Sequence, residues 1–134
     1  MTPPESQGQG IAAETPALPA VSFCVLAKRA DFLKAASARR QGVGGLLLQA
    51  RDRADGSPLV RIGFTASKKI GNAVLRNRAK RRLRALAHEQ LRPVARPGWD
   101  YVLVARPDET VTRPYAELKS DLAEALRSVH RVRT

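Results

Sequence analysis

The chain has very little of what disulfide, zinc and membrane proteins need. Cys24 is its single cysteine, which excludes an intramolecular disulfide and any zinc site built on several cysteines. The two histidines, His88 and His130, lie far apart and match no metal-ligand spacing. No apolar run approaches the ~20 residues of a membrane span, and the N-terminus lacks the features of a signal peptide. We therefore expect a reduced, cytoplasmic protein with no metal and no membrane partner.

Aromatic residues are also scarce, so the core must be built from Leu, Val, Ile and Ala. The 134 residues are 43% apolar, which is enough for one modest core and one domain. Residues 1–20 are rich in proline and poor in large side chains, and they cannot bury enough surface to offset the entropy of ordering. We predict a disordered tail over residues 1–20 and a folded RNA-binding domain over residues 21–134.

Acidic residues are missing from one long segment. Between Arg61 and Arg84 the chain has nine Lys or Arg residues and no Asp or Glu, while the net charge of the whole chain is +12. Like charges at this density repel one another, so the segment indicates a polyanion as its partner. A solvated basic face is the ordinary alternative, but such faces usually mix signs. A nuclear-localisation signal at residues 80–82 would normally lie on a flexible segment.

The pattern of elements predicts an α+β fold with one sheet. Residues 31–40 fit a short helix, and residues 46–50 and 59–65 fit two strands that we expect to pair as an antiparallel hairpin. A longer helix begins after its N-cap, Asn72, and closes before Pro93. Residues 99–105 fit a buried strand. Thr112 can cap a last helix, whose apolar residues recur at helical spacing: Tyr115, Leu118, Leu122, Leu126 and Val129.

The basic helix divides into faces when its residues are placed 3.6 to a turn. The apolar stripe that must face the core contains Leu75, Ala79, Leu83 and Leu86. A cationic row beside it is formed by Arg76, Lys80 and Arg84, and the surface continues through Asn77 and Arg81. The opposite flank carries Arg78 and Arg82. The helix therefore presents two cationic flanks.

The approach to this helix also suits phosphate. Lys68 and Lys69 precede its N-terminus, where free backbone N–H groups and the helix dipole favour an anion. Asn77 is uncharged and can hydrogen-bond a base edge or a 2′-hydroxyl.

Residues 60–81, VRIGFTASKKIGNAVLRNRAKR, closely resemble the signature of the bacterial ribonuclease P protein component. The distinguishing element is Arg76-Asn77-Arg78 preceded by SKKIGNA. The resemblance covers roughly residues 29 to 129 and excludes the proline-rich tail. It implies an αβββαβα sandwich similar to the second domain of ribosomal protein S5 and to translocase domain IV. It also implies a left-handed strand–helix–strand crossover around the basic helix, against the usual preference.

The resemblance further implies a function. The family's holoenzyme is an endoribonuclease that removes the 5′ leader of precursor tRNA, and its RNA subunit carries the active site and holds the Mg²⁺. The protein is then a non-catalytic subunit that needs no protein partner. The residues agree, because the sequence has no clustered carboxylates for a two-metal site and no clear nucleophile–base pair.

The resemblance also assigns residues to RNA. Together with the residues before the helix, the predicted RNA contacts are Lys68, Lys69, Asn72, Arg76, Asn77, Arg78, Lys80, Arg81 and Arg84. The leader is expected in a cleft between the sheet and the first helix, lined by Phe32, Phe64, Lys80 and Arg84. Where the family often has a second aromatic residue, this chain has Ala36.

Three other classes of protein remain as alternatives. A ribosomal or ribosome-assembly protein would share the fold and charge but not the Arg-Asn-Arg context. A free-standing nuclease needs its own carboxylate or histidine site. A DNA architectural protein should bind duplex at least as well as folded RNA.

Overall fold

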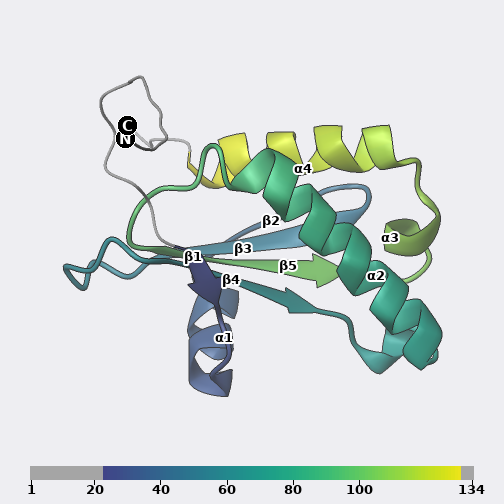
Figure 1. Cartoon of the computed structure of the whole chain (residues 1–134), viewed down its shortest axis with the longest axis horizontal. Helices are drawn as coiled ribbons and strands as arrows, with labels where there is room; N and C mark the ends of the chain where they lie inside the picture. The colour runs from purple at the N-terminus through teal and green to yellow at the C-terminus, as the bar shows by residue number, and fades with distance from the viewer. Residues whose placement is uncertain (1–22, 131–134) are drawn as a thin grey trace, which may run out of the picture.

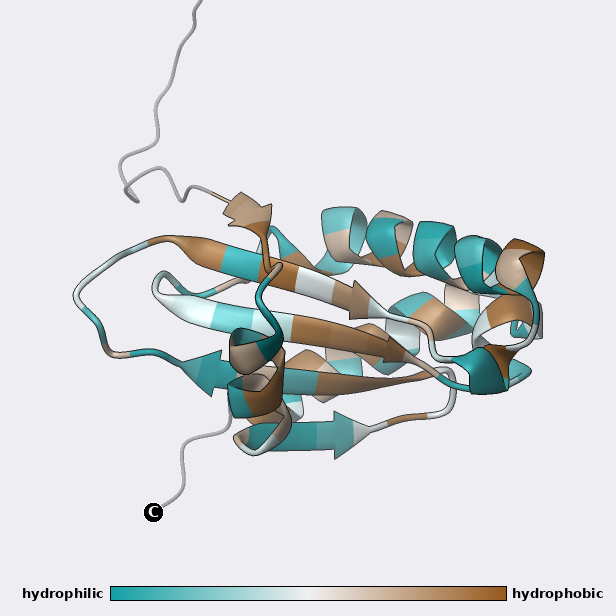
Figure 2. Ribbon diagram, turned by 90° about the horizontal axis from the view of Figure 1, so that it is seen from below, coloured by the Kyte–Doolittle hydropathy of each residue, from teal (hydrophilic) through white to brown (hydrophobic). Residues whose placement is uncertain are grey.

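A computed structural model describes residues 23–130, so the predicted tail and both ends of the predicted domain lie outside the described residues. A five-stranded sheet has the order β1-β4-β5-β3-β2. Figures 1 and 2 place α1 on one face of this sheet and α2 and α4 on the other. The elements are β1 Phe23–Val25, α1 Arg29–Ala36, β2 Arg39–Gly42, β3 Leu46–Asp52, β4 Val60–Thr65, α2 Ala73–Leu86, β5 Trp99–Ala105, α3 Glu109–Thr112 and α4 Tyr115–Val129.

β5 is the centre of the sheet and confirms the predicted strand over residues 99–105. It runs antiparallel to β3, with Leu46 opposite Ala105, and parallel to β4, with Arg61 opposite Asp100. The predicted hairpin between β3 and β4 is therefore wrong. The two strands were expected to pair because they are neighbours in sequence, but the strand that is apolar on both faces takes the position between them.

The first helix is shorter than predicted. It ends at Ala36, and Arg39 and Arg40, expected at the end of the helix, belong to β2, which pairs with β3 from Arg39 opposite Ala50 to Gly42 opposite Leu47. Pairing with a buried strand outweighs the helix propensity of this short segment. β1 was not predicted, because it has three residues and forms only by lying parallel to β4.

The start of α2 agrees with the prediction. The Asn72 side-chain oxygen accepts a hydrogen bond from the Leu75 N–H at 3.0 Å, so Asn72 is the N-cap. Gly71 before it has φ of 136°, a conformation that favours glycine. The helix ends at Leu86 and continues as a π-helical segment, Ala87–Leu91, which finishes before Pro93.

The connection from β4 through α2 to β5 is left-handed. In Figure 1 both strands run to the right, β5 lies above β4, and α2 lies in front of them. With the strands turned to point upward and the helix toward the viewer, the chain moves leftward from β4 to β5. This is the handedness that the resemblance implies, and after β1 the principal elements follow the expected order αβββαβα.

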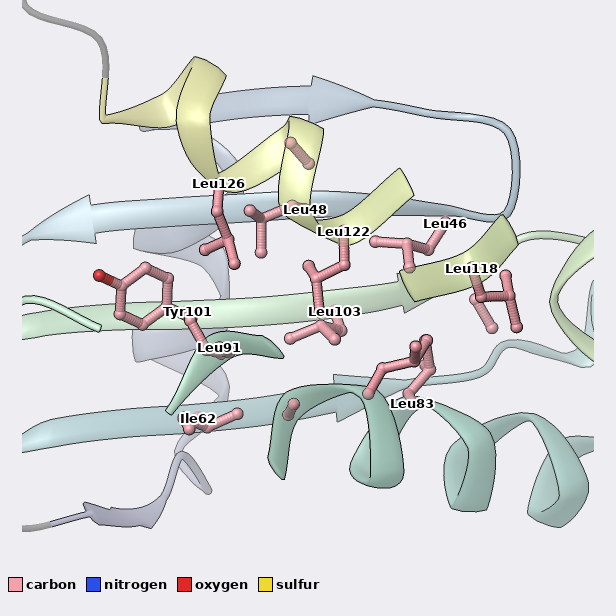
Figure 3. Packing of buried hydrophobic residues seen from close by; sticks show 14 of the residues in the cluster. Leu46, Leu48, Ile62, Leu83, Leu91, Tyr101, Leu103, Leu118, Leu122 and Leu126 are labelled. Atoms are coloured by element: carbon pink, nitrogen blue, oxygen red, sulfur yellow. The ribbon is translucent and has the colours of Figure 1, made fainter. Parts of the chain in front are cut away.

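The main core lies between the sheet and the helices α2 and α4 (Figure 3). Leucines of both helices meet side chains of β3 and β5 there, and the members include Leu83, Leu118, Leu122, Leu46, Leu48, Tyr101 and Leu103. A smaller cluster under α1 joins Leu26, Ala35 and Val102. The predicted last helix is present, but its predicted cap is wrong: Thr112 belongs to α3, and Pro114 occupies the N-cap of α4.

Candidate RNA interface

The cationic residues of α2 lie on two flanks, as the helical phasing predicts. On one flank the Arg84 guanidinium carbon lies 5.6 Å from the centre of the Phe64 ring on β4. On the other, Arg78 and Arg82 line a groove of about 310 Å³ beside α3. Figure 2 shows hydrophilic colouring along the outer side of α2. The apolar stripe between the flanks is buried at Ala79, Leu83 and Leu86, while Leu75 at its end is 37% exposed.

Two of the nine cations hold the fold together instead of facing solvent. Arg82 donates hydrogen bonds to the carbonyl oxygens of Thr110 and Arg113, at 3.1 and 2.7 Å. Arg61 pairs with the carboxylates of Asp31 and Asp100. The hydrogen bonds that Asp100 accepts from Arg61 raise the pKa of Arg61, so its guanidinium stays charged. Both side chains are used in contacts within the fold. The other seven cations of the segment remain for a ligand.

Those seven lie along the path from β4 to the end of α2. Lys68 and Lys69 are exposed in a short 3₁₀ turn, Lys68–Ile70, which the Ser67 hydroxyl caps by accepting from the Lys69 N–H. In α2 the exposed members are Arg78, Arg81 and Arg84, and the half-buried members are Arg76 and Lys80. Among the ion pairs that join residues 23–130, only those of Arg61 involve a cation of this segment.

The two polar uncharged residues differ in their roles. Asn77 is exposed between Arg76 and Arg78, so its amide can reach a ligand on the surface of α2. The side-chain oxygen of Asn72 is already engaged as the helix cap, which leaves only its NH₂ group for RNA.

The structure does not bring the predicted cleft residues together. Phe32 on α1 packs against Gly63 of β4, where a Cβ would lie 2.6 Å from the ring. Phe64 is the next residue of the strand and therefore points to the opposite face, where it meets Arg84. Lys80 is on the same helix as Arg84. Phe32 and Ala36 thus belong to the α1 face, and Phe64, Lys80 and Arg84 to the α2 face.

The α2 face also contains two residues that the sequence did not single out. The Arg92 guanidinium carbon lies 4.5 Å from the centre of the Phe23 ring, a closer contact than that of Arg84 with Phe64. The signal was present in the spacing, because Arg92 follows Arg84 and His88 at intervals of four residues.

Within residues 23–130, no group of three or more His, Cys, Asp or Glu side chains is placed to hold a metal ion. In the same range, no helix is long and apolar enough to cross a membrane.

Comparison with known proteins identifies the family. The family model for ribonuclease P matches residues 22–130. The ribonuclease P protein component of Ruegeria pomeroyi is 57% identical over 119 residues, which span 84% of this chain and 95% of the relative. That of Caulobacter vibrioides is 51% identical over 109 residues, spanning 81% and 72%.

Solved structures show the same fold. The Staphylococcus aureus RNase P protein superimposes with a TM-score of 0.64 at 22% identity, covering 79% of this chain and 94% of that one. The Thermotoga maritima RNase P protein gives a TM-score of 0.63 at 22% identity, covering 81% and 97%. The chain therefore belongs to the family of ribonuclease P protein components, the protein subunits of a tRNA-processing ribonucleoprotein.

Proposed function

We propose that this protein binds the catalytic RNA subunit of ribonuclease P through α2 and the residues that lead into it. The observation that carries the proposal is the acid-free surface of seven cations from Lys68 to Arg84. Arg61 and Arg82 do not count toward this surface, because both are already engaged within the fold. Cations without carboxylate neighbours bind phosphates and release counterions, which favours RNA over a neutral partner.

The protein's part in the reaction is to bind and to position. The seven cations neutralise phosphates of the folded RNA, and Asn77 donates to a 2′-hydroxyl or a base edge. The Mg²⁺ of the reaction is held by the RNA, and no bond-breaking step falls to the protein. Its buried carboxylates are engaged elsewhere: Asp100 contacts Arg53 and Arg61, and Asp121 contacts Arg113.

The 5′ leader of precursor tRNA is the second proposed RNA ligand. Phe32 is half-buried on the α1 face of the sheet, so part of the residue is accessible to a base. A base stacked on an aromatic ring contributes ~1–3 kcal/mol. Ala36, one turn later, adds no second ring. The α1 face of this protein should therefore hold the leader mainly by stacking on Phe32 and by contacts with the backbone of the leader strand.

Reconstitution is the experiment that tests this function. Precursor tRNA is incubated at low Mg²⁺ with the catalytic RNA alone, with the protein alone, and with both. We expect cleavage at the mature 5′ end only when both are present, because the protein replaces part of the phosphate screening that Mg²⁺ otherwise provides. Cleavage by the protein alone, or no stimulation of the RNA by the protein, would contradict the proposal.

A further inference from the structure

A groove of about 300 Å³ lies between β1 and the end of α2, on the face of the sheet opposite Phe32. We call it the β1 groove. β1 contributes Phe23 and Val25, β4 contributes Phe64, and α2 with the π-helical segment contributes Arg84, His88 and Arg92. Its volume is at the lower end of the range for small-ligand sites. Among residues 23–130 no carboxylate lines it, so an anionic ligand meets no repulsion from the walls that this part of the chain forms.

Two aromatic rings and two guanidinium groups are paired inside the groove. Arg92 lies over Phe23 and Arg84 over Phe64, at 4.5 and 5.6 Å from the ring centres. Both rings are half-buried, and both arginines are exposed. Flat apolar surfaces beside guanidinium groups are the combination by which proteins hold unpaired bases, since the base stacks while the cation meets the phosphate.

The groove continues the cationic row of α2. Arg76, Lys80, Arg84, His88 and Arg92 follow one another at intervals of four residues. In a regular α-helix such a row drifts around the axis, because four residues turn slightly more than one full turn. The π-helical segment, closed by the Arg92 N–H bonding the Ala87 carbonyl at 2.9 Å, has wider turns and slows this drift. His88 and Arg92 therefore remain on the side of β1.

The His88 ring at the edge of the groove is oriented by its contact with Arg92. Arg92 Nη1 lies 3.2 Å from His88 Nδ1, and because an arginine can only donate, His88 Nδ1 accepts. The proton of the neutral ring is then on Nε2, which leaves an N–H for a base edge or a phosphate oxygen. Placing π-helical geometry at this point agrees with its frequent occurrence at functional sites.

We infer that the β1 groove binds an unpaired nucleotide of an RNA strand whose backbone follows the row from Arg76 to Arg92. The inference rests on the proposed function, because it extends the α2 interface by one site for a single-stranded base. It is a different site from the leader face, which lies on the other side of the sheet with Phe32. The aromatic pairs favour a base over a bare phosphate, and the two guanidinium groups favour a nucleotide over an apolar peptide.

A thiol at position 25 gives a direct reporter for this groove. Val25 lines the groove, is exposed, and shares the sheet face of Phe23, whereas the side chain of Cys24 alternates to the opposite face. Because Cys24 is the single cysteine of the chain, combining Cys24→Ser with Val25→Cys leaves one thiol, at the groove. The rate of thiol alkylation by iodoacetamide is measured first for the protein alone. It is then measured with a ten-residue oligouridylate, with a hairpin RNA of equal phosphate number, and with inorganic polyphosphate of equal charge. At an oligouridylate concentration of about ten times its Kd, alkylation should slow roughly tenfold by mass action. The hairpin stem and polyphosphate should leave the rate nearly unchanged.

Variants separate stacking from charge. Phe23→Leu keeps an apolar side chain but removes the flat ring, and oligouridylate affinity should fall about 5- to 150-fold, the range for one stacked base. Arg92→Gln should also weaken binding, whereas Arg127→Gln, an exposed charge on α4, serves as the matched control. Far-UV circular dichroism checks that each variant is folded, and Arg92→Gln tests the site should Phe23→Leu perturb β1.

The outcomes are distinct from those of the proposed function. If the α2 interface is wrong, neither oligonucleotide nor catalytic RNA binds with salt-dependent affinity. If only the groove is wrong, oligouridylate binds but the thiol at position 25 reacts at its free rate, and Phe23→Leu binds as the parent does. Equal protection by polyphosphate would also overturn the inference, since it would show a charged surface without a base site.

Discussion

The guanidinium of Arg61 holds the carboxylate of Asp100 at two points, with Nε 2.8 Å from Oδ1 and Nη2 2.7 Å from Oδ2. Asp100 is fully buried in the central strand, and Arg53 also donates to it at 2.7 Å. Arg61 reaches further to Asp31 on α1, at 3.0 Å. The first cation of the acid-free segment therefore ties α1 to the sheet.

Asp100→Asn should be strongly destabilising, because it removes the buried carboxylate that Arg53 and Arg61 share and leaves each with only a more exposed partner, Asp55 or Asp31. Breaking such a pair by removing one partner typically lowers the free energy of unfolding by ~3–5 kcal/mol. Urea unfolding followed by circular dichroism measures the change. Glu124→Gln, on the exposed side of α4, is the control and should stay within ~0.5 kcal/mol of the parent. A loss of similar size in both variants would refute the structural role of the pair.

Arg76→Ala combined with Arg78→Ala should weaken binding of the catalytic RNA and flatten its salt dependence. If the parent contacts ~4–6 phosphates, the slope of log K against log salt is roughly −3 to −5, and each lost contact reduces it by ~1. Filter binding between low and moderate salt measures both slopes. Removing Lys119 and Arg127 from α4 takes away the same charge and should leave the slope near that of the parent. A parent slope near zero would refute the electrostatic interface.

Arg82→Ala should lower stability more than RNA affinity. Arg82 donates to two backbone carbonyls at the junction of α3 and α4, and losing hydrogen bonds from a charged group costs ~1.5–3 kcal/mol each. The adjacent Arg81 is exposed, so Arg81→Ala should show the reverse: normal urea unfolding and weaker RNA binding. An Arg82→Ala protein as stable as the parent would show that these hydrogen bonds contribute nothing.

His130 should make stability fall in mildly acidic solution. Burial, with Arg96 and Arg39 nearby, lowers its pKa to about 4, while the Tyr101 hydroxyl lies 2.8 Å from Nε2. The ordinary histidine pKa is ~6.5, so between that pH and about 4 the unfolded state binds a proton that the folded state does not. The free energy of unfolding therefore decreases as pH falls through this window.

The measurement is a series of urea unfolding curves from pH 7 to pH 4.5 for the parent and for His130→Gln. Glutamine can still accept from Tyr101 but does not titrate, so its profile should be flatter than that of the parent. Carboxylates that titrate at the lower end contribute equally to both proteins and cancel in the comparison. Parallel profiles would exclude His130 as the source.

The sequence predicts those parts of the fold that depend on local signals. The Asn72 cap, the apolar stripe of α2 and the strand over residues 99–105 each follow from residues within a few positions of one another. The strand order does not follow from such local signals. Strands that are neighbours in sequence were expected to pair, but β5, which is buried on both faces, takes the middle position. β1 depends on β4 for its pairing and has no pattern of its own.

The same division applies to the site. The two cationic flanks of α2 follow from helical periodicity alone. The hidden roles of Arg61 and Arg82 depend on partners 28 or more residues away, which no local pattern shows. Alternation along β4 does place Phe64 on the face of Ile62. The sequence does not indicate which face of the sheet α1 covers. Because α1 packs on the face opposite Phe64, Phe32 is separated from Phe64.

Gly63→Ala should reveal how tightly Phe32 is held on its face of the sheet. A Cβ at position 63 would lie 2.6 Å from Cε1 and 2.8 Å from Cζ of the Phe32 ring, so the ring must move. Overpacking of this kind costs ~1–3 kcal/mol. Unfolding of Gly63→Ala, Phe32→Ala and the double variant forms a double-mutant cycle.

The cycle should be strongly non-additive, because removing the ring leaves only the milder contact with Leu26 Cβ at 3.1 Å, and alanine suits a strand better than glycine does. In the Phe32→Ala background the second change should therefore cost little or even stabilise. The same variant links packing to function: displacing the Phe32 ring should weaken binding of a single-stranded leader oligonucleotide while leaving the salt slope for the catalytic RNA unchanged. Additive stabilities would contradict the contact between the Phe32 ring and position 63. Unchanged leader affinity with a displaced ring would remove Phe32 from the leader site and leave the α2 face as the single-strand surface.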